Sequence, residues 1–205
     1  VVGRSFSPDC LRYSLAQAAQ NSGFVFRHET IKAVHPTDRT VATDKGLDSA
    51  DALILATGSR STFYGQDAIA ERALTLDDVE DALCIRERLG KSGGDVLVCG
   101  GGYTGVELAT AIVRHDWENG HERKVRILDR SSTLCSSLPQ VFQDYIGATF
   151  EGLGVGVLTE ATVERVKEHQ VTVSNGQVLN NTWLVWTAGV SLPSFLRTLN
   201  VPKSD

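Results

Sequence analysis

The sequence predicts an α/β fold in which a parallel sheet is followed by a small antiparallel meander. A strand expected at 95–99 is followed by a helical repeat at 103–115 and by a second expected strand at 124–129, the order that is typical of a β-α-β unit. Farther along, short strands expected between 156 and 178 are separated by polar turns. One of these turns contains Asn175-Gly176, which favours a tight hairpin.

The elements before the β-α-β unit are expected to be short. Leu11 and Leu15 begin a helical repeat that predicts a helix over 11–20. The continuous apolar run 52–56 ends at Thr57-Gly58-Ser59, as an interior strand buried on both faces does. The other elements expected here are a strand at 24–26, a hairpin formed by 30–34 and 40–43, and a surface helix at 76–89.

Three further elements complete the predicted unit. A helix is expected over 139–152, strands over 156–158 and 162–166 lead into the meander, and an apolar strand is expected over 182–187. Trp183 and Trp186 lie three residues apart, so in a strand they face opposite sides of the sheet, where we expect them to pack in the core.

Composition and charge exclude several classes of function. With 205 residues, of which 41% are hydrophobic, the chain can form one large domain or one domain with part of another. A net charge of -5 gives no basic field for DNA or RNA, so nucleic acid is not expected as a partner. No apolar run approaches the roughly 18 residues of a membrane span. Because the chain begins Val1-Val2-Gly3, we interpret it as a piece of a longer protein.

The cysteines and histidines give no sign of a thiol or metal centre. Cys99 is expected inside an apolar strand, and the spacing of the four cysteines matches neither a redox pair nor a zinc site. Reduced thiols suit a cytoplasmic location. We interpret the five histidines as surface residues rather than metal ligands or bases, namely His28, His35, His115, His121 and His169.

A glycine-rich turn gives the strongest functional signal. The segment Gly100-Gly101-Gly102-Tyr103-Thr104-Gly105 follows a predicted strand directly and opens a predicted helix. In this context the first glycine of GxGxxG permits the tight turn, the second lets a pyrophosphate approach the backbone, and the third lets helix and strand pack closely. N–H groups at the start of the helix then face the phosphates. The turn therefore predicts a Rossmann-like, dinucleotide-binding domain.

An acidic residue at the end of the next strand indicates which dinucleotide is bound. Asp129 follows the glycines by about 20 to 25 residues, where a carboxylate can accept hydrogen bonds from the adenosine ribose. Its charge would repel the 2′-phosphate of NADPH, which favours NADH, although Arg130 beside it keeps NADPH open. Glu107 either balances the positive helix start or leans towards the nicotinamide, and the sequence leaves both roles open.

Three segments of the chain follow one another in the order ADALILATGSRSTFYG, VLVCGGGYTGVELATAI and WLVWTAGV. In this order they resemble the FAD-dependent pyridine nucleotide-disulfide oxidoreductases, most closely the type II NADH dehydrogenases, and the resemblance covers nearly the whole chain. It implies a flavoprotein NADH oxidoreductase in which hydride passes from NADH to FAD and on to a quinone or another acceptor. The cofactor-binding residues expected from the motif and the resemblance are Gly100, Gly101, Gly102, Tyr103, Thr104, Gly105, Glu107, Asp129, Ala188 and Gly189.

The resemblance also implies a division of the chain. Residues 70–188 would form the NADH-binding domain, and residues 1–69 with the return segment 189–205 would be incomplete pieces of the FAD-binding domain. The family's own glycine turn for FAD has no counterpart here, so we expect the isolated chain to lack FAD and to be inactive. The longer protein could attach to the cytoplasmic face of a membrane, and a homodimer could cover the exposed edge of the incomplete domain.

Other functions share parts of this pattern. A domain that only senses NADH would use the same glycines and Asp129, and a disulfide or ferredoxin-type reductase would share the fold. A short-chain dehydrogenase is disfavoured, because none of the four tyrosines is followed four residues later by lysine.

Overall fold

The computed structural model describes residues 2–3, 7–91, 93–197 and 199. The chain divides into two compact units, a larger one of residues 1–11 and 61–190 and a smaller one of residues 12–60 and 191–205. The functional boundaries expected at 69/70 and 188/189 remain predictions. The outermost parts of those expected domains, at residue 1 and residues 200–205, lie outside the described residues.

The larger unit contains a five-stranded sheet in which all neighbouring strands run parallel. The strand order is β5-β12-β6-β7-β8. The prediction of an α/β fold with a parallel sheet is therefore confirmed. The bounds of these strands are Leu74–Thr75 for β5, Thr182–Trp186 for β12, Asp95–Cys99 for β6, Val125–Leu128 for β7 and Gly156–Leu158 for β8.

The predicted meander is also present. Strands β9 (Val163–Lys167), β10 (Gln170–Val173) and β11 (Val178–Asn180) form a separate antiparallel sheet. Gly176 has a φ of +84° in the turn between β10 and β11, a conformation that glycine adopts without steric cost.

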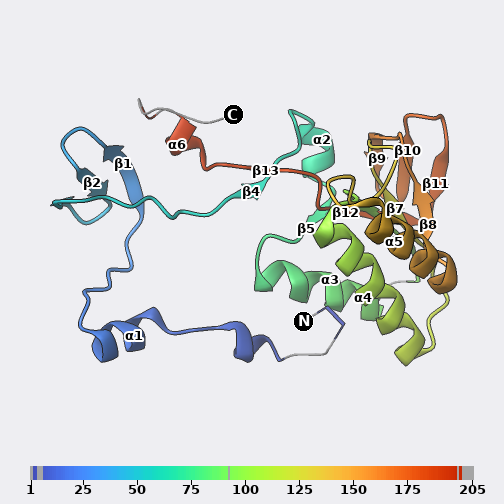
Figure 1. The fold of residues 1–205 in the computed structure, drawn as a ribbon, viewed down its shortest axis with the longest axis horizontal. Helices are drawn as coiled ribbons and strands as arrows, with labels where there is room; N and C mark the ends of the chain where they lie inside the picture. The colour runs from blue at the N-terminus through green and yellow to red at the C-terminus, as the bar shows by residue number, and fades with distance from the viewer. Residues whose placement is uncertain (1, 4–6, 92, 198, 200–205) are drawn as a thin grey trace. The chain divides into compact units, whose positions relative to one another are not determined.

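Alternate residues of the parallel strands pack into two different cores. Val96 and Val98 of β6 lie in one core with residues of the helices α3 (Val79–Lys91), α4 (Tyr103–Asn119) and α5 (Gln140–Leu153). Leu97 of β6 lies in the other core, against the meander and the short helix α2 (Asp67–Ala70). Figure 1 shows the three longer helices and the meander around the sheet. Trp183 belongs to the first core and Trp186 to the second, as their spacing predicted.

The prediction that all histidines are surface residues is wrong for His115. Helix α4 continues to Asn119, beyond the predicted end, so His115 extends the apolar stripe of Leu108 and Ile112 and is only 1% exposed. Beside it, the Asp116 carboxylate is buried with the Arg123 guanidinium, whose Nε lies 2.7 Å from Oδ2. The Nε–H of Arg123 does not point at the carboxylate well enough for a hydrogen bond, so the contact with Asp116 is an ion pair only.

The described part of the smaller unit contains helix α1 (Leu15–Ser22) and a three-stranded antiparallel sheet of β1 (Ile31–His35), β2 (Thr40–Thr43) and β3 (Leu47–Ser49). The β1–β2 hairpin is the one the sequence predicted, whereas β3 was not predicted. The Ser14 hydroxyl accepts a hydrogen bond from the Gln17 N–H and so caps α1.

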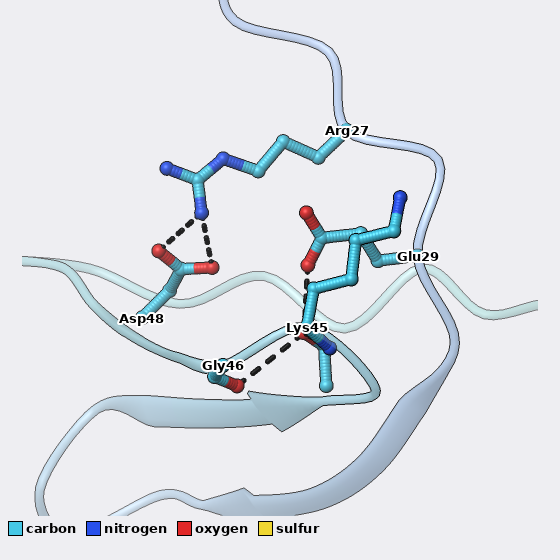
Figure 2. A network of polar contacts seen from close by, with 6 residues as sticks. Arg27, Glu29, Lys45, Gly46 and Asp48 are labelled. Carbon is cyan, nitrogen blue, oxygen red and sulfur yellow. Dashed lines mark hydrogen bonds and ion pairs between the residues drawn. The ribbon is translucent and has the colours of Figure 1, made fainter.

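Polar contacts tie the segment before β1 to the β2–β3 hairpin. Nη1 of Arg27 donates to both carboxylate oxygens of Asp48, at 2.5 and 2.6 Å (Figure 2). The Thr43 hydroxyl lies 2.6 Å from a carboxylate oxygen of Glu29 and 3.3 Å from the Gly46 carbonyl oxygen. These residues are exposed or half-buried, so the contacts orient the loops more than they stabilise the unit.

Two predicted strands of the smaller unit are absent. Residues 24–26 and 52–56 form neither a strand nor a helix. Instead of being buried on both faces, Ile54 is 88% exposed. A continuous apolar run is buried only when neighbouring strands and helices cover it, and within the described smaller unit no element does.

The remaining elements are short. The strands β4 (Arg60–Ser61) and β13 (Val190–Ser191) pair with each other, and the chain also forms a 3-10 turn over Pro8–Leu11 and helix α6 (Ser194–Arg197). Among the described residues, no helix combines the length and hydropathy that crossing a bilayer requires.

Candidate functional site

A pocket of about 560 Å³ lies at the carboxyl ends of three adjacent parallel strands of the larger unit. Ligands of open α/β sheets bind at this edge, because loops and helix N-termini converge there. The pocket is lined by the turn after β6 (Gly100, Gly101, Gly102, Tyr103), the loop after β7 (Asp129, Arg130, Ser131, Thr133, Cys135, Ser136, Ser137), the segment after β12 (Thr187, Ala188, Gly189), and Tyr64, Gln66, Cys99, Leu128, Ala161, Thr162, Val163 and Trp186.

Close contacts in the glycine turn leave no room for side chains at Gly100 and Gly105. Gly100 has a φ of +120°, which L side chains rarely adopt, and a Cβ there would lie 2.8 Å from the Ala188 nitrogen. A Cβ on Gly105 would overlap the carbonyl oxygen of Gly100, so the absence of a side chain lets α4 start against the turn. Gly102, in contrast, faces open space. The N–H groups of the first turn of α4 have no carbonyl one turn earlier, which leaves them available to an anion.

Asp129 holds this turn in place. One carboxylate oxygen accepts a hydrogen bond of 2.6 Å from the Gly101 N–H, and the other accepts one of 2.7 Å from the Ser131 N–H. A carboxylate has about four lone-pair sites, so each oxygen can still accept a hydrogen bond from a ligand hydroxyl. The carboxylate therefore joins the glycine turn to the loop after β7 and faces the same pocket.

The pocket brings together seven of the ten residues expected to bind a cofactor. These are Gly100, Gly101, Gly102, Tyr103, Asp129, Ala188 and Gly189. Thr104, Gly105 and Glu107 belong to α4 and do not line the pocket. Gly105 is buried where the helix contacts the turn, whereas Glu107 is exposed.

Several residues that line the pocket were not predicted from the sequence. Tyr64 and Gln66 lie in the segment before α2, more than thirty residues ahead of the glycine turn in the chain. The serines and threonines of the loop after β7 carry no pattern beyond polarity. A signal for that loop was available, because every loop after a parallel strand next to the glycine turn opens on the same edge of the sheet.

The two thiols in the pocket are poor nucleophiles. Burial, together with the charge of Asp129, raises the pKa of Cys99 from 9.0 to about 12. The same two causes, burial first, raise the pKa of Cys135. Both cysteines are therefore protonated at neutral pH, and neither forms a disulfide.

Comparison with known families gives a match over almost the entire chain. Residues 8–203 match the family described as pyridine nucleotide-disulphide oxidoreductase. The match includes both the segments around the glycine turn and the smaller unit.

Individual relatives differ in what they are named for. The chain is 26% identical over 198 residues to the demethylphylloquinone reductase NdbB of Synechocystis, covering 90% of this chain and 48% of the relative. A ferredoxin reductase from Rhodopseudomonas palustris has a similar structure, with a TM-score of 0.84 at 17% identity, over 99% of this chain and 51% of that one. NDH2 from Plasmodium falciparum in complex with NADH superposes with a TM-score of 0.73 at 21% identity, over 83% of this chain and 42% of that one. The chain thus spans about half the length of these proteins.

Proposed function

The chain belongs to the pyridine nucleotide-disulphide oxidoreductase family, and from that premise we propose that its larger unit binds NADH in the pocket at the ends of β6, β7 and β12. Members of the family are NAD(P)H-dependent flavoprotein oxidoreductases that bind FAD and NAD(P)H. The observation that carries the proposal is the joining of the glycine turn to Asp129 at one edge of the parallel sheet.

The residues present fit a dinucleotide. The open space at Gly102 and the start of α4 suit the pyrophosphate, which needs close approach to the backbone and N–H donors. Asp129, on the β7 side, suits the adenosine ribose. Ala188 and Gly189, on the β12 side, then face the nicotinamide half. The pocket volume of about 560 Å³ is within the usual range for small-molecule sites.

The charge at the β7 side favours NADH over NADPH. The Asp129 carboxylate would lie beside the 2′-phosphate of NADPH, and the two negative charges would repel each other. Arg130 lines the pocket next to it and is exposed, so water screens its attraction for the phosphate.

In the longer protein we assign this chain the role of positioning NADH for hydride transfer. FAD, when bound, accepts the hydride and passes the electrons on. Residues 70–188 would form the NADH-binding domain, and the acceptor would be a quinone or another electron carrier. The names of the relatives support both kinds of electron acceptor, since one is a quinone reductase and another a ferredoxin reductase. The protonated thiols of the pocket do not favour a disulfide reductase that acts through Cys99 or Cys135.

Calorimetric titration of the purified chain with NADH and, separately, with NADPH tests the proposal. The flavin absorbance of the sample is recorded first. We expect tighter binding of NADH than of NADPH and a colourless protein. If neither nucleotide binds, the proposed NADH site is wrong. Binding of NADH would not by itself separate an enzyme from a sensor, so electron transfer to quinones is measured on the longer protein reconstituted with FAD.

Replacing Asp129 tests which residue selects the nucleotide. In Asp129→Asn the amide cannot accept hydrogen bonds at both positions, and the repulsion of a 2′-phosphate is removed. We expect NADH affinity to fall about 10- to 150-fold, equivalent to a charged hydrogen bond of about 1.5–3 kcal/mol, and the preference for NADH over NADPH to be lost. An unchanged preference would show that another group selects the nucleotide.

A further inference from the structure

Tyr64 has an unusual backbone conformation at the mouth of the pocket. Its φ is +53°, in the left-handed region that bulky residues rarely occupy. Its side chain is 63% exposed although it lines the pocket. A strained residue persists when its surroundings over-determine it, and such residues cluster at ligand sites. An exposed aromatic ring inside a pocket also offers an apolar face to a ligand.

The surroundings of Tyr64 do hold it firmly. The Thr62 N–H donates to the Gly189 carbonyl oxygen at 3.3 Å. The Trp186 indole N–H lies 2.9 Å from the carbonyl oxygens of both Thr62 and Ala188. The ring of Phe63 stacks on the ring of Trp186 with centroids 5.1 Å apart. The two residues before Tyr64 are therefore anchored to Trp186 at the end of β12 and to Gly189 in the segment that follows it.

Gly189 leaves the space that the Tyr64 ring needs. A Cβ at Gly189 would overlap the phenol oxygen of Tyr64, and Gly189 itself has a φ of +81°. The two residues thus have complementary unusual conformations, and together they place the phenol ring against the backbone on the β12 side of the pocket.

The strand order tells which half of a dinucleotide this ring faces. β6 lies between β12 and β7 in the sheet. With the pyrophosphate at the turn after β6 and the adenosine ribose at Asp129 after β7, the other half of the ligand extends towards the end of β12. Tyr64 is next to Gly189 at that end.

We propose that Tyr64 is a positioning residue that forms a wall against the nicotinamide riboside half of the bound dinucleotide. This inference rests on the proposed function and deepens it. The ring, held in one place by the turn, limits where the nicotinamide can lie and so sets the face that it presents to an electron acceptor. The contact is made by the aromatic ring, because the hydroxyl lies against Gly189.

Two variants and two ligands test this. Tyr64→Asn removes the ring and keeps a residue type that tolerates the left-handed conformation, so it should fold like the native chain. Tyr64→Phe keeps the ring. Each protein is titrated with NADH and with ADP-ribose, which has the adenosine and pyrophosphate but no nicotinamide. We expect Tyr64→Asn to bind NADH about tenfold more weakly and ADP-ribose with unchanged affinity, and Tyr64→Phe to bind both like the native chain.

The outcomes separate this inference from the proposed function. If the native chain binds neither ligand, the proposed NADH site itself fails. If the native chain binds NADH but Tyr64→Asn binds it equally well, the site stands and the role of Tyr64 is refuted. Equal weakening of NADH and ADP-ribose also overturns the inference, since it would mean that Tyr64 supports the whole pocket rather than the nicotinamide half. Urea unfolding of each variant verifies that the proteins compared are folded.

Discussion

Replacing Gly105 with alanine should destabilise the protein, although the same change elsewhere in a helix stabilises it. A Cβ at Gly105 would overlap the Gly100 carbonyl oxygen and lie 3.0 Å from the Thr187 hydroxyl oxygen. The overlapped atom is backbone, so either the glycine turn or α4 must shift. Overpacking of this kind costs about 1–3 kcal/mol. The higher helix propensity of alanine offsets about 0.5–1 kcal/mol of that cost, which leaves a net loss of about 1 kcal/mol from the midpoints of both ranges and of about 2.5 kcal/mol at most.

Gly147 provides the matched control. It lies inside α5, where a Cβ would meet nothing within 4 Å. Gly147→Ala has only the propensity gain and should stabilise the protein by about 0.5–1 kcal/mol. The two variants carry the same chemical change, so the difference between their free energies of unfolding isolates the contact at the turn.

Urea unfolding followed by circular dichroism measures both effects, with unchanged slopes required for the comparison. NADH titration adds a second measure, because a shifted turn would also weaken binding in Gly105→Ala and leave Gly147→Ala unaffected. If Gly105→Ala were as stable as the native chain and bound NADH with the same affinity, the close contact between α4 and the glycine turn would contribute nothing to stability or binding. The reasoning for Gly105 would then be refuted.

Two further predictions concern buried ionisable groups. The pKa of Cys99 is raised from 9.0 to about 12 by folding, so above pH 9 the folded chain keeps a proton that the unfolded chain loses. The free energy of unfolding is therefore unaffected by this thiol below pH 9 and decreases as the pH rises from 9 towards 12. Between pH 8 and pH 10 the free energy of unfolding of the native chain should therefore fall by about 1.4 kcal/mol more than that of Cys99→Ala. The control Cys84→Ala, which removes an exposed cysteine, should follow the native chain. Equal pH dependence of all three proteins in urea unfolding would contradict the raised pKa of Cys99. Asp116→Asn leaves the buried Arg123 guanidinium without its counter-charge and should cost about 3–5 kcal/mol in the same assay, while a loss below about 1 kcal/mol would mean that water reaches the pair.

The parallel sheet was predictable because its strands carry their own signal. Residues of β6 are apolar on both faces, and the structure buries them in two cores, so the run 95–99 matches the strand without error. The glycine turn follows it directly, and its context distinguished it from an ordinary loop. In such places the local pattern and the final packing agree.

The same apolar signal failed where packing partners are lacking. Residues 52–56 are as apolar as β6, but within the smaller unit they have no neighbouring strand and stay exposed. Sequence periodicity reports what a segment could bury, not whether something covers it. The wall formed by Tyr64 could not be predicted for a different reason: it depends on the backbone conformations of Tyr64 and Gly189, two residues far apart in the chain.

In the proposed NADH site, Asp129 would link nucleotide selectivity to the geometry of the glycine turn. The sequence predicted a carboxylate that can accept ribose hydroxyls, and in the structure the same group accepts hydrogen bonds from the N–H groups of Gly101 and Ser131. If this site binds NADH as proposed, a change that removes the charge to admit NADPH would also release the turn from its Asp129 hydrogen bond. Selectivity and turn geometry would then not be altered independently at this position. Converting the site to NADPH would require a new acceptor for the Gly101 N–H as well as a cation for the 2′-phosphate, and Arg130 could supply only the second.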